Sequence, residues 1–163
     1  MGSFETKIVI PDLTTEQKYL PISSVVLSYQ RENLAAPVGS AERDKKLLAA
    51  NPLIQDNEKL VPSVTRVFRK DHDMYVYLEI YQPAAEKTEL LVASVSFYRR
   101  VKAFETAPLK ITAGLNAKSK AVPVGFSVPL KKLQPGGYTC QVNVLNPSEQ
   151  KFAVRRSPIV LLP

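Results

Sequence analysis

The only histidine of the chain, His72, is the first place to look for acid–base or metal chemistry. It lies between Asp71 and Asp73 in a short polar segment. A hydrolase would need a histidine beside a nucleophile, but the sequence has no Gly-x-Ser-x-Gly motif and no carboxylates paired as an acid and a base. Adjacent residues of a turn rarely converge on one ion, and the sequence holds no second group of metal ligands. We therefore expect a solvated turn, with no catalytic residue, no metal site and no cofactor.

A row of tyrosines offers a different chemistry, the binding of a ligand on a flat surface. In residues 74–81, apolar side chains alternate with Tyr75, Tyr77, a glutamate and Tyr81. This period of two predicts a strand whose apolar side faces the core and whose tyrosines face outwards. The tyrosines, with Arg66 nearby, could stack on sugar rings or contact a protein partner. The alternative is that they pack across strands or under the N-terminal arm.

The positive charge of the chain raises the question of a polyanionic partner. The sequence has 22 Lys and Arg against 15 Asp and Glu, a formal net charge of +7. Four basic doublets stand out: Arg69-Lys70, Arg99-Arg100, Lys131-Lys132 and Arg155-Arg156. A nucleic-acid site would need them on one face with aromatic residues between them. We expect them instead at strand ends and hairpin tips, where charges keep turns solvated and protect sheet edges. Nucleic acid is therefore not the expected partner.

The elements that must position these residues are strands, and Tyr138 is the clearest mark of the fold. It follows a Pro-Gly-Gly turn and begins an alternating strand that puts Cys140, Val142 and Val144 on its own face. In immunoglobulin-like sandwiches, a tyrosine two residues before the second disulfide cysteine bonds back to upstream backbone. The spacing predicts such a tyrosine corner. Cys140 is the only cysteine, so no internal disulfide can form, and we expect a buried, unreactive thiol.

Recurrent short strands with turns between them complete an all-β pattern. Alternation predicts strands over residues 4–10, 23–28, 61–68, 74–81, 90–98, 101–111, 122–130, 138–145 and 152–162. The polar turn over residues 69–73 predicts a hairpin of the third and fourth of these strands. The sequence predicts an immunoglobulin- or fibronectin-III-like β-sandwich.

The first fifty residues differ from the remainder. Ser40 to Asn51 has a serine in the N-cap position, good helix formers and a proline after its end, which predicts one short helix in an N-terminal connection. We divide the chain into an arm over residues 1–50, either packed on the sandwich or loosely tied to it, and a sandwich over residues 51–163. No apolar run approaches the ~20 residues of a membrane span, and the N-terminus has no secretory signal pattern. Because strand-like alternation starts almost at once, we expect a part of a longer protein.

Four segments carry a resemblance to a known family. They are Leu60-Val-Pro-Ser-Val-Thr-Arg-Val-Phe, Met74-Tyr-Val-Tyr-Leu-Glu, Lys102-Ala-Phe-Glu-Thr-Ala-Pro-Leu and the ending from Val124 to Pro163. Over most of its length the chain resembles the C-terminal region of the von Willebrand factor A-related proteins of the Acidobacteria. The resemblance implies an exported bacterial protein, periplasmic or secreted, with an A domain upstream of this region. The Asp-x-Ser-x-Ser metal motif of A domains is absent, so no functional residue carries over.

We expect a non-catalytic interaction or spacer module of such a protein, whose partners are other domains of the same chain or another protein. The alternative is a module that binds a glycan or another anionic envelope polymer through an exposed row of Tyr75, Tyr77 and Tyr81 with Arg66. The two hypotheses differ in whether the tyrosines are exposed or covered.

Overall fold

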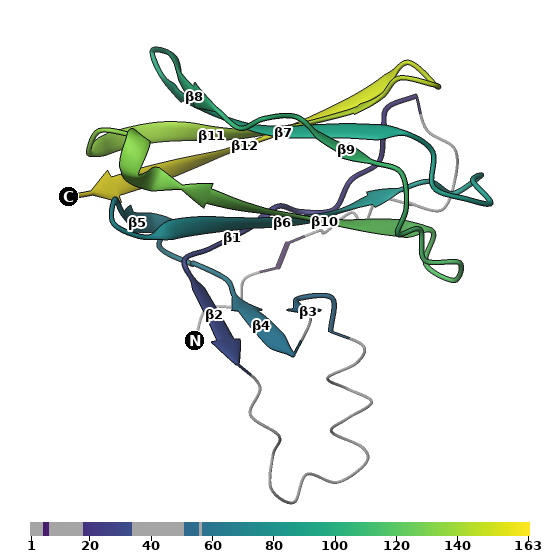
Figure 1. Ribbon diagram of the computed structural model, residues 1–163, viewed down its shortest axis with the longest axis horizontal. Helices are drawn as coiled ribbons and strands as arrows, with labels where there is room; N and C mark the ends of the chain where they lie inside the picture. The colour runs from purple at the N-terminus through teal and green to yellow at the C-terminus, as the bar shows by residue number, and fades with distance from the viewer. Residues whose placement is uncertain (1–4, 7–17, 34–50, 56) are drawn as a thin grey trace, which may run out of the picture.

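The computed structural model describes residues 5–6, 18–33, 51–55 and 57–163. This part of the chain is built almost entirely of strands, with one short 3₁₀ helix, η1 (Leu130–Lys132). Figure 1 shows two sheets stacked face to face and a smaller sheet beneath them. The helix predicted from Ser40 and most of the strand predicted from residue 4 lie outside the described residues.

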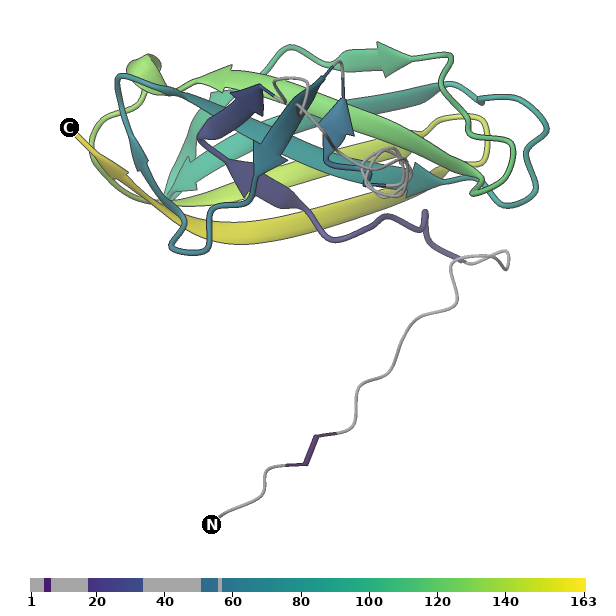
Figure 2. The same ribbon diagram turned by 90° about the horizontal axis from the view of Figure 1, so that it is seen from below.

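Three sheets make up the fold, and we name them by their place in Figure 1. The lower sheet has the order β1 (Val26–Ser28), β6 (Asp73–Tyr81), β10 (Ala121–Pro129). The upper sheet has the order β5 (Val67–Arg69), β12 (Lys151–Leu162), β11 (Gly136–Asn146), β7 (Leu91–Arg99), β8 (Val101–Glu105), and β9 (Leu109–Ile111) also pairs with β7. The cover sheet has the order β2 (Gln30–Asn33), β4 (Glu58–Val61), β3 (Ile54–Gln55). Seen from below, it crosses the outer face of the lower sheet (Figure 2).

The core lies between the lower and upper sheets, where their inward side chains meet. These are alternate residues of the central strands, chiefly Met74, Val76, Leu78 and Ile80 of β6, Leu91, Ala93, Val95 and Phe97 of β7, and Cys140, Val142 and Val144 of β11. All of them are at most 3% exposed. The all-β fold and the inward faces of these strands are therefore as the sequence predicts.

Tyr138 ties the turn before β11 to the sandwich. Its ring is 6% exposed, and its hydroxyl donates a 2.7 Å hydrogen bond to the carbonyl oxygen of Gln134, four residues upstream. The same turn accepts a 3.3 Å hydrogen bond from Arg99 Nη1 to the oxygen of Pro135. Gly136 has φ of 141°, and a Cβ atom there would lie 3.1 Å from the guanidinium carbon of Arg99. This position therefore requires glycine.

The predicted hairpin of residues 61–68 with 74–81 is wrong. β5 pairs in parallel with β12 of the upper sheet, whereas β6 pairs with β1 and β10 of the lower sheet. The polar turn between them therefore crosses from one sheet to the other. The predicted strand itself is broken, because Pro62 has no N–H to donate and Arg66 has φ of 55°, which a strand cannot hold.

The predicted strand over residues 101–111 is also interrupted, and it forms β8 and β9 with Pro108 between them. In the arm, β1 is a strand of the lower sheet and β2 a strand of the cover sheet, so residues 26–33 pack on the sandwich. In the described part of the chain, no helix has the length and apolar character that crossing a membrane requires.

Candidate functional site

The three tyrosines of the predicted row do share the outer face of β6, but the row is not open to solvent. Tyr77 is 7% exposed, and Tyr75 and Tyr81 are half-buried. The exposed row that the glycan hypothesis requires is therefore wrong at its centre, whereas the other hypothesis, packing under the N-terminal arm, holds at Tyr75, which Arg31 of the arm contacts. The physical reason is the cover sheet, whose Leu60, with the preceding Leu53, lines one small pocket together with Tyr77.

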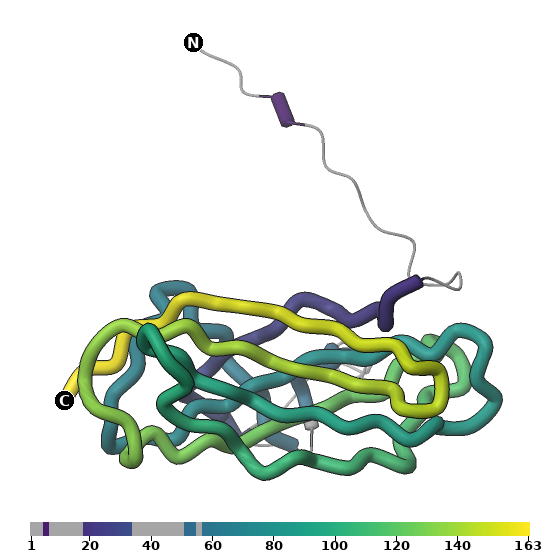
Figure 3. The backbone as a smooth tube through the Cα atoms, turned by 90° about the horizontal axis from the view of Figure 1, so that it is seen from above, coloured from purple at the N-terminus to yellow at the C-terminus, as the bar shows by residue number. Residues whose placement is uncertain are grey.

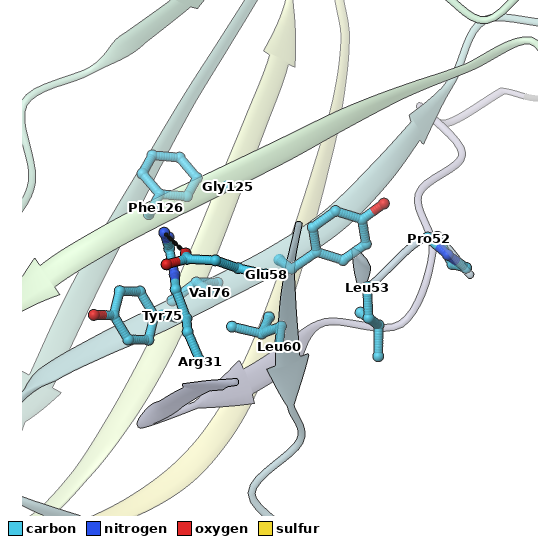
Figure 4. Close-up of a pocket in the computed structure, with 10 residues that line it drawn as sticks. Arg31, Pro52, Leu53, Glu58, Leu60, Tyr75, Val76, Gly125 and Phe126 are labelled. Atoms are coloured by element: carbon cyan, nitrogen blue, oxygen red, sulfur yellow. Dashed lines mark hydrogen bonds and ion pairs between the residues drawn. The ribbon is translucent and has the colours of Figure 1, made fainter. Parts of the chain in front are cut away.

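That pocket lies between the lower sheet and the cover sheet (Figure 4). Its volume is about 60 Å³, far below the roughly 300–1,000 Å³ of typical ligand pockets. Arg31 of β2 lies over the ring of Tyr75, with its guanidinium carbon 4.1 Å from the ring centroid. The same guanidinium places Nη1 3.2 Å from Oε2 of Glu58 on β4. Arg31 thus fastens the cover sheet to the tyrosine face.

The cation beside the tyrosines is therefore Arg31, and Arg66 lies elsewhere. Arg66 sits in the loop before β5, where its N–H donates to Oγ of Ser63 at 3.2 Å and its carbonyl oxygen accepts from the N–H of Val160 at 3.0 Å. These backbone bonds hold the entry to β5. No sequence pattern indicates Arg31, because it lies in a polar segment without strand-like alternation.

Glu79 holds the other two tyrosines. Its carboxylate accepts hydrogen bonds from the hydroxyls of Tyr77 at 3.3 Å and Tyr81 at 3.0 Å, and its own N–H donates to Oγ of Ser23 at 2.8 Å. Burial, together with the charge of Glu79, raises the pKa of Tyr77 and of Tyr81 above the usual range. The phenols therefore stay protonated at neutral pH and serve as hydrogen-bond donors.

A wider groove adjoins this face. It has a volume of about 800 Å³ and is lined by Tyr77 and Glu79 on β6, by Pro123 on β10, and by the loop that contains Asn116, Lys118 and Ser119, among other residues. This size lies within the range of ligand sites. Unlike the small pocket, the groove is large enough for a sugar ring, and its lining includes the carboxylate of Glu79.

The Asp71–His72–Asp73 segment forms an exposed turn. The carboxylate of Asp71 accepts a 3.1 Å hydrogen bond from Nε of Arg69 and lies 3.0 Å from Nδ1 of His72. The bond from Arg69 lowers the pKa of Asp71 below its usual value. Within the described ranges, no three His, Cys, Asp or Glu side chains come close enough to hold a metal ion.

Cys140 faces the core, as predicted, and is 1% exposed. Burial raises the pKa of its thiol to about 12. A thiol with this pKa is almost wholly protonated at neutral pH, so it is a poor nucleophile.

No model of a known protein family matches the sequence, and no functionally curated protein matches it.

Proposed function

We propose that the chain is a non-catalytic interaction or spacer module, folded as an immunoglobulin- or fibronectin-III-like sandwich. The observation that carries this proposal is the cover sheet. It occupies the tyrosine face, where Arg31 and Glu79 use the tyrosines for internal contacts. Tyrosines that hold two parts of one chain together serve its rigidity, which is what a spacer needs.

The strand order supports the finer assignment of the fold. In immunoglobulin sandwiches, strands A, B and E lie in one sheet and strands C, F and G in the other. Here β1, β6 and β10 form one sheet, and β7, β11 and β12 adjoin one another in the opposite sheet. The bond from Tyr138 to upstream backbone lies at the start of β11, the strand that would correspond to F.

The wider setting of the module follows from the family resemblance. As a C-terminal region of the von Willebrand factor A-related proteins of the Acidobacteria, the module would belong to an exported bacterial protein. An A domain would then precede it, and its partners would be that domain, another domain of the chain or a second protein.

A second candidate function is the binding of an envelope glycan in the groove beside Tyr77. The groove volume of about 800 Å³ favours it. Glu79 disfavours an anionic polymer there, because its carboxylate lines the groove. A neutral sugar is the better fit.

Binding of the purified domain to an array of envelope glycans and polyanions at two salt concentrations tests the two candidates. Lys118→Glu changes the charge of an exposed groove residue, and Lys110→Glu on β9 is the matched control outside the groove lining. The module hypothesis expects no binding that survives high salt. Salt-resistant binding that Lys118→Glu removes and Lys110→Glu leaves intact would replace it with glycan recognition.

A further inference from the structure

The outer face of the upper sheet carries an apolar stripe along β12. Phe152, Val154, Val160 and Leu162 point outwards there and are 57%, 36%, 44% and 44% exposed. Leu145 of β11, opposite Phe152, is 43% exposed and extends the stripe. In the view from above, no described segment lies over this face (Figure 3). A solvated sheet face normally carries polar side chains, and contiguous exposed apolar groups mark interaction sites.

A one-way chain of hydrogen bonds crosses the same face from β12 to β8. Arg156 Nε donates to Oε1 of Gln141 at 2.7 Å, and Gln141 Nε2 donates to Oδ1 of Asn143 at 2.6 Å. Asn143 Nδ2 donates to Oγ of Ser96 at 3.2 Å, and that hydroxyl donates to Oε1 of Glu105 at 2.9 Å. Each group donates a hydrogen bond to the next, from the Arg156 cation to the Glu105 carboxylate. The dipoles are therefore aligned, and each bond strengthens its neighbour.

This series of hydrogen bonds fixes the guanidinium of Arg156. Its Nε is held by Gln141, which is 9% exposed and bonded at both ends. Its two Nη atoms have no partner in the part of the chain that the structure describes, and the side chain is exposed. Arg156 and Gln141 line a depression of about 330 Å³ together with Tyr98 and Thr139. A guanidinium held in place with a free fork is prepared for bidentate binding of a carboxylate.

The charges of the face select the same ligand. The residues of β7, β11 and β12 include no Asp or Glu. Arg156 alternates along β12 with the exposed Val154 and Val160, so it is the charged residue that these three strands place on the outer face, whereas Lys151 and Arg155 alternate with the buried Ala153 and Ile159. Glu105 on β8 already accepts from Lys102 Nζ at 2.7 Å, a bond that lowers its pKa. An acidic partner is therefore complementary to this face.

The apolar stripe distinguishes between two kinds of ligand that could supply a carboxylate, an acidic sugar and an acidic polypeptide. A uronate sugar would satisfy Arg156, but its hydroxyls would gain nothing from Val154, Phe152 or Val160. A polypeptide that carries an acidic side chain between apolar ones would satisfy both, in the way that protein interfaces surround an arginine anchor with apolar contacts.

We propose that the outer face of the upper sheet binds a polypeptide segment in which an Asp or Glu, flanked by apolar residues, places its carboxylate on Arg156. This inference rests on the proposed function, since it names the chemistry of the module's protein partner. Arg156 is the anchor, Gln141 positions it, and the β12 stripe supplies the apolar contacts.

The proposal is tested by selecting a phage-displayed library of random seven-residue peptides for binding to the whole chain. We expect enriched peptides to contain one Asp or Glu between Val, Leu, Ile or Phe, and their Asn or Gln versions to bind about tenfold more weakly. Arg156→Gln should weaken the acidic peptides by the same factor. Arg155→Gln is the matched control, with the same composition and net charge, and should bind within about twofold of the parent chain. Arg156→Lys keeps the charge without the planar fork and should not restore binding.

Several outcomes would overturn the proposal. They are no enrichment, enrichment of peptides without an acidic residue, or equal losses in Arg155→Gln and Arg156→Gln. Binding of polygalacturonate in place of peptides would assign the face to a glycan. Dimerisation in sedimentation velocity that Arg156→Gln abolishes would assign it to a second copy. Failure in the peptide selection leaves the proposed function standing, because that function fails only on salt-resistant glycan binding in the groove. Urea midpoints of the variants establish that each one folds.

Discussion

Replacing Tyr138 by phenylalanine isolates one hydrogen bond of the fold. The substitution keeps the buried ring, which is 6% exposed, and removes only the hydroxyl that lies 2.7 Å from the oxygen of Gln134. That bond spans the turn between η1 and β11. If the bond holds the turn against the sandwich, its loss should lower the free energy of unfolding without changing the fold.

The expected loss is about 1 kcal/mol, the middle of the range for one net hydrogen bond. A larger loss would require the oxygen of Gln134 to stay unpaired in the variant. Gln134 is exposed, so water can take the place of the hydroxyl. For a chain of this length, a change of ~1 kcal/mol lowers the melting temperature by roughly 2–4 °C. With an m-value of about 2 kcal/mol per molar, it lowers the urea midpoint by about 0.5 M.

Urea unfolding followed by circular dichroism measures this difference. Tyr98→Phe is the matched control, because Tyr98 is half-exposed on the outer face of the upper sheet and the substitution removes the same atom. We expect its free energy of unfolding to change by no more than an ordinary surface substitution does, about 0.5 kcal/mol. The same urea midpoint for Tyr138→Phe and the parent chain would refute the conclusion that this bond holds the turn. Equal losses of unfolding free energy in Tyr138→Phe and Tyr98→Phe would refute it as well.

Three further substitutions or conditions test the fold. Gly136→Ala should lower stability by about 1 kcal/mol or more, because φ is 141° and a Cβ would lie only 3.1 Å from the guanidinium of Arg99. Gly137→Ala, with nothing within 4 Å, should be nearly neutral in the same urea titration. The pKa of Tyr77 is raised in the folded chain, so the protonated phenol stabilises the fold. This contribution to the free energy of unfolding is complete below about pH 10 and is lost as the pH rises from there towards the folded pKa. Between about pH 8 and 11, the urea midpoint should therefore fall less steeply with pH in Tyr77→Phe than in the parent chain. Native Cys140 should resist a thiol reagent at pH 8 and react fast in urea, since burial keeps its pKa near 12; rapid labelling of the folded chain would contradict the burial.

The sequence predicts those strands whose pattern is local and one-sided. β7, β10, β11 and β12 each begin and end within two residues of their predicted bounds. In each, an alternating face meets the core, and a proline, glycine or polar turn ends the run. The hydrogen bond of Tyr138 was predictable for the same reason, because the residue and its acceptor are separated by one turn.

Pairings between distant segments could not be predicted. β5 pairs with β12 near the other end of the chain, and nothing in the run from Val61 to Phe68 specifies that partner. A short polar turn predicts a hairpin in isolation, but β5 pairs with β12 in the opposite sheet from β6, and its Phe68, 2% exposed, is buried in the core. Tertiary burial here overrides the local signal.

The tyrosine face shows the same limit. Alternation fixes which side of β6 carries Tyr75 and Tyr77, but it does not tell what lies on that side. The cover sheet comes from residues 30–33, 54–55 and 58–61, which are polar or mixed in sequence. Its contacts with the tyrosines, such as Arg31 on Tyr75, depend on two strands that meet only in the folded chain.

Both outer faces of the sandwich carry apolar or aromatic side chains, but only one of them is covered by the described part of the chain. On β6, outward Tyr75 and Tyr77 lie against the chain's own third sheet. On β12, outward Val154, Val160 and their neighbours have no cover within the described residues. Burying the exposed part of each such side chain in a partner could contribute about 1 kcal/mol, so the stripe can supply affinity. Because charge pairs contribute more to specificity than to affinity, Arg156 would select the partner. Val154→Ser should therefore weaken acidic and neutral peptides alike, whereas Arg156→Gln should remove the preference between them.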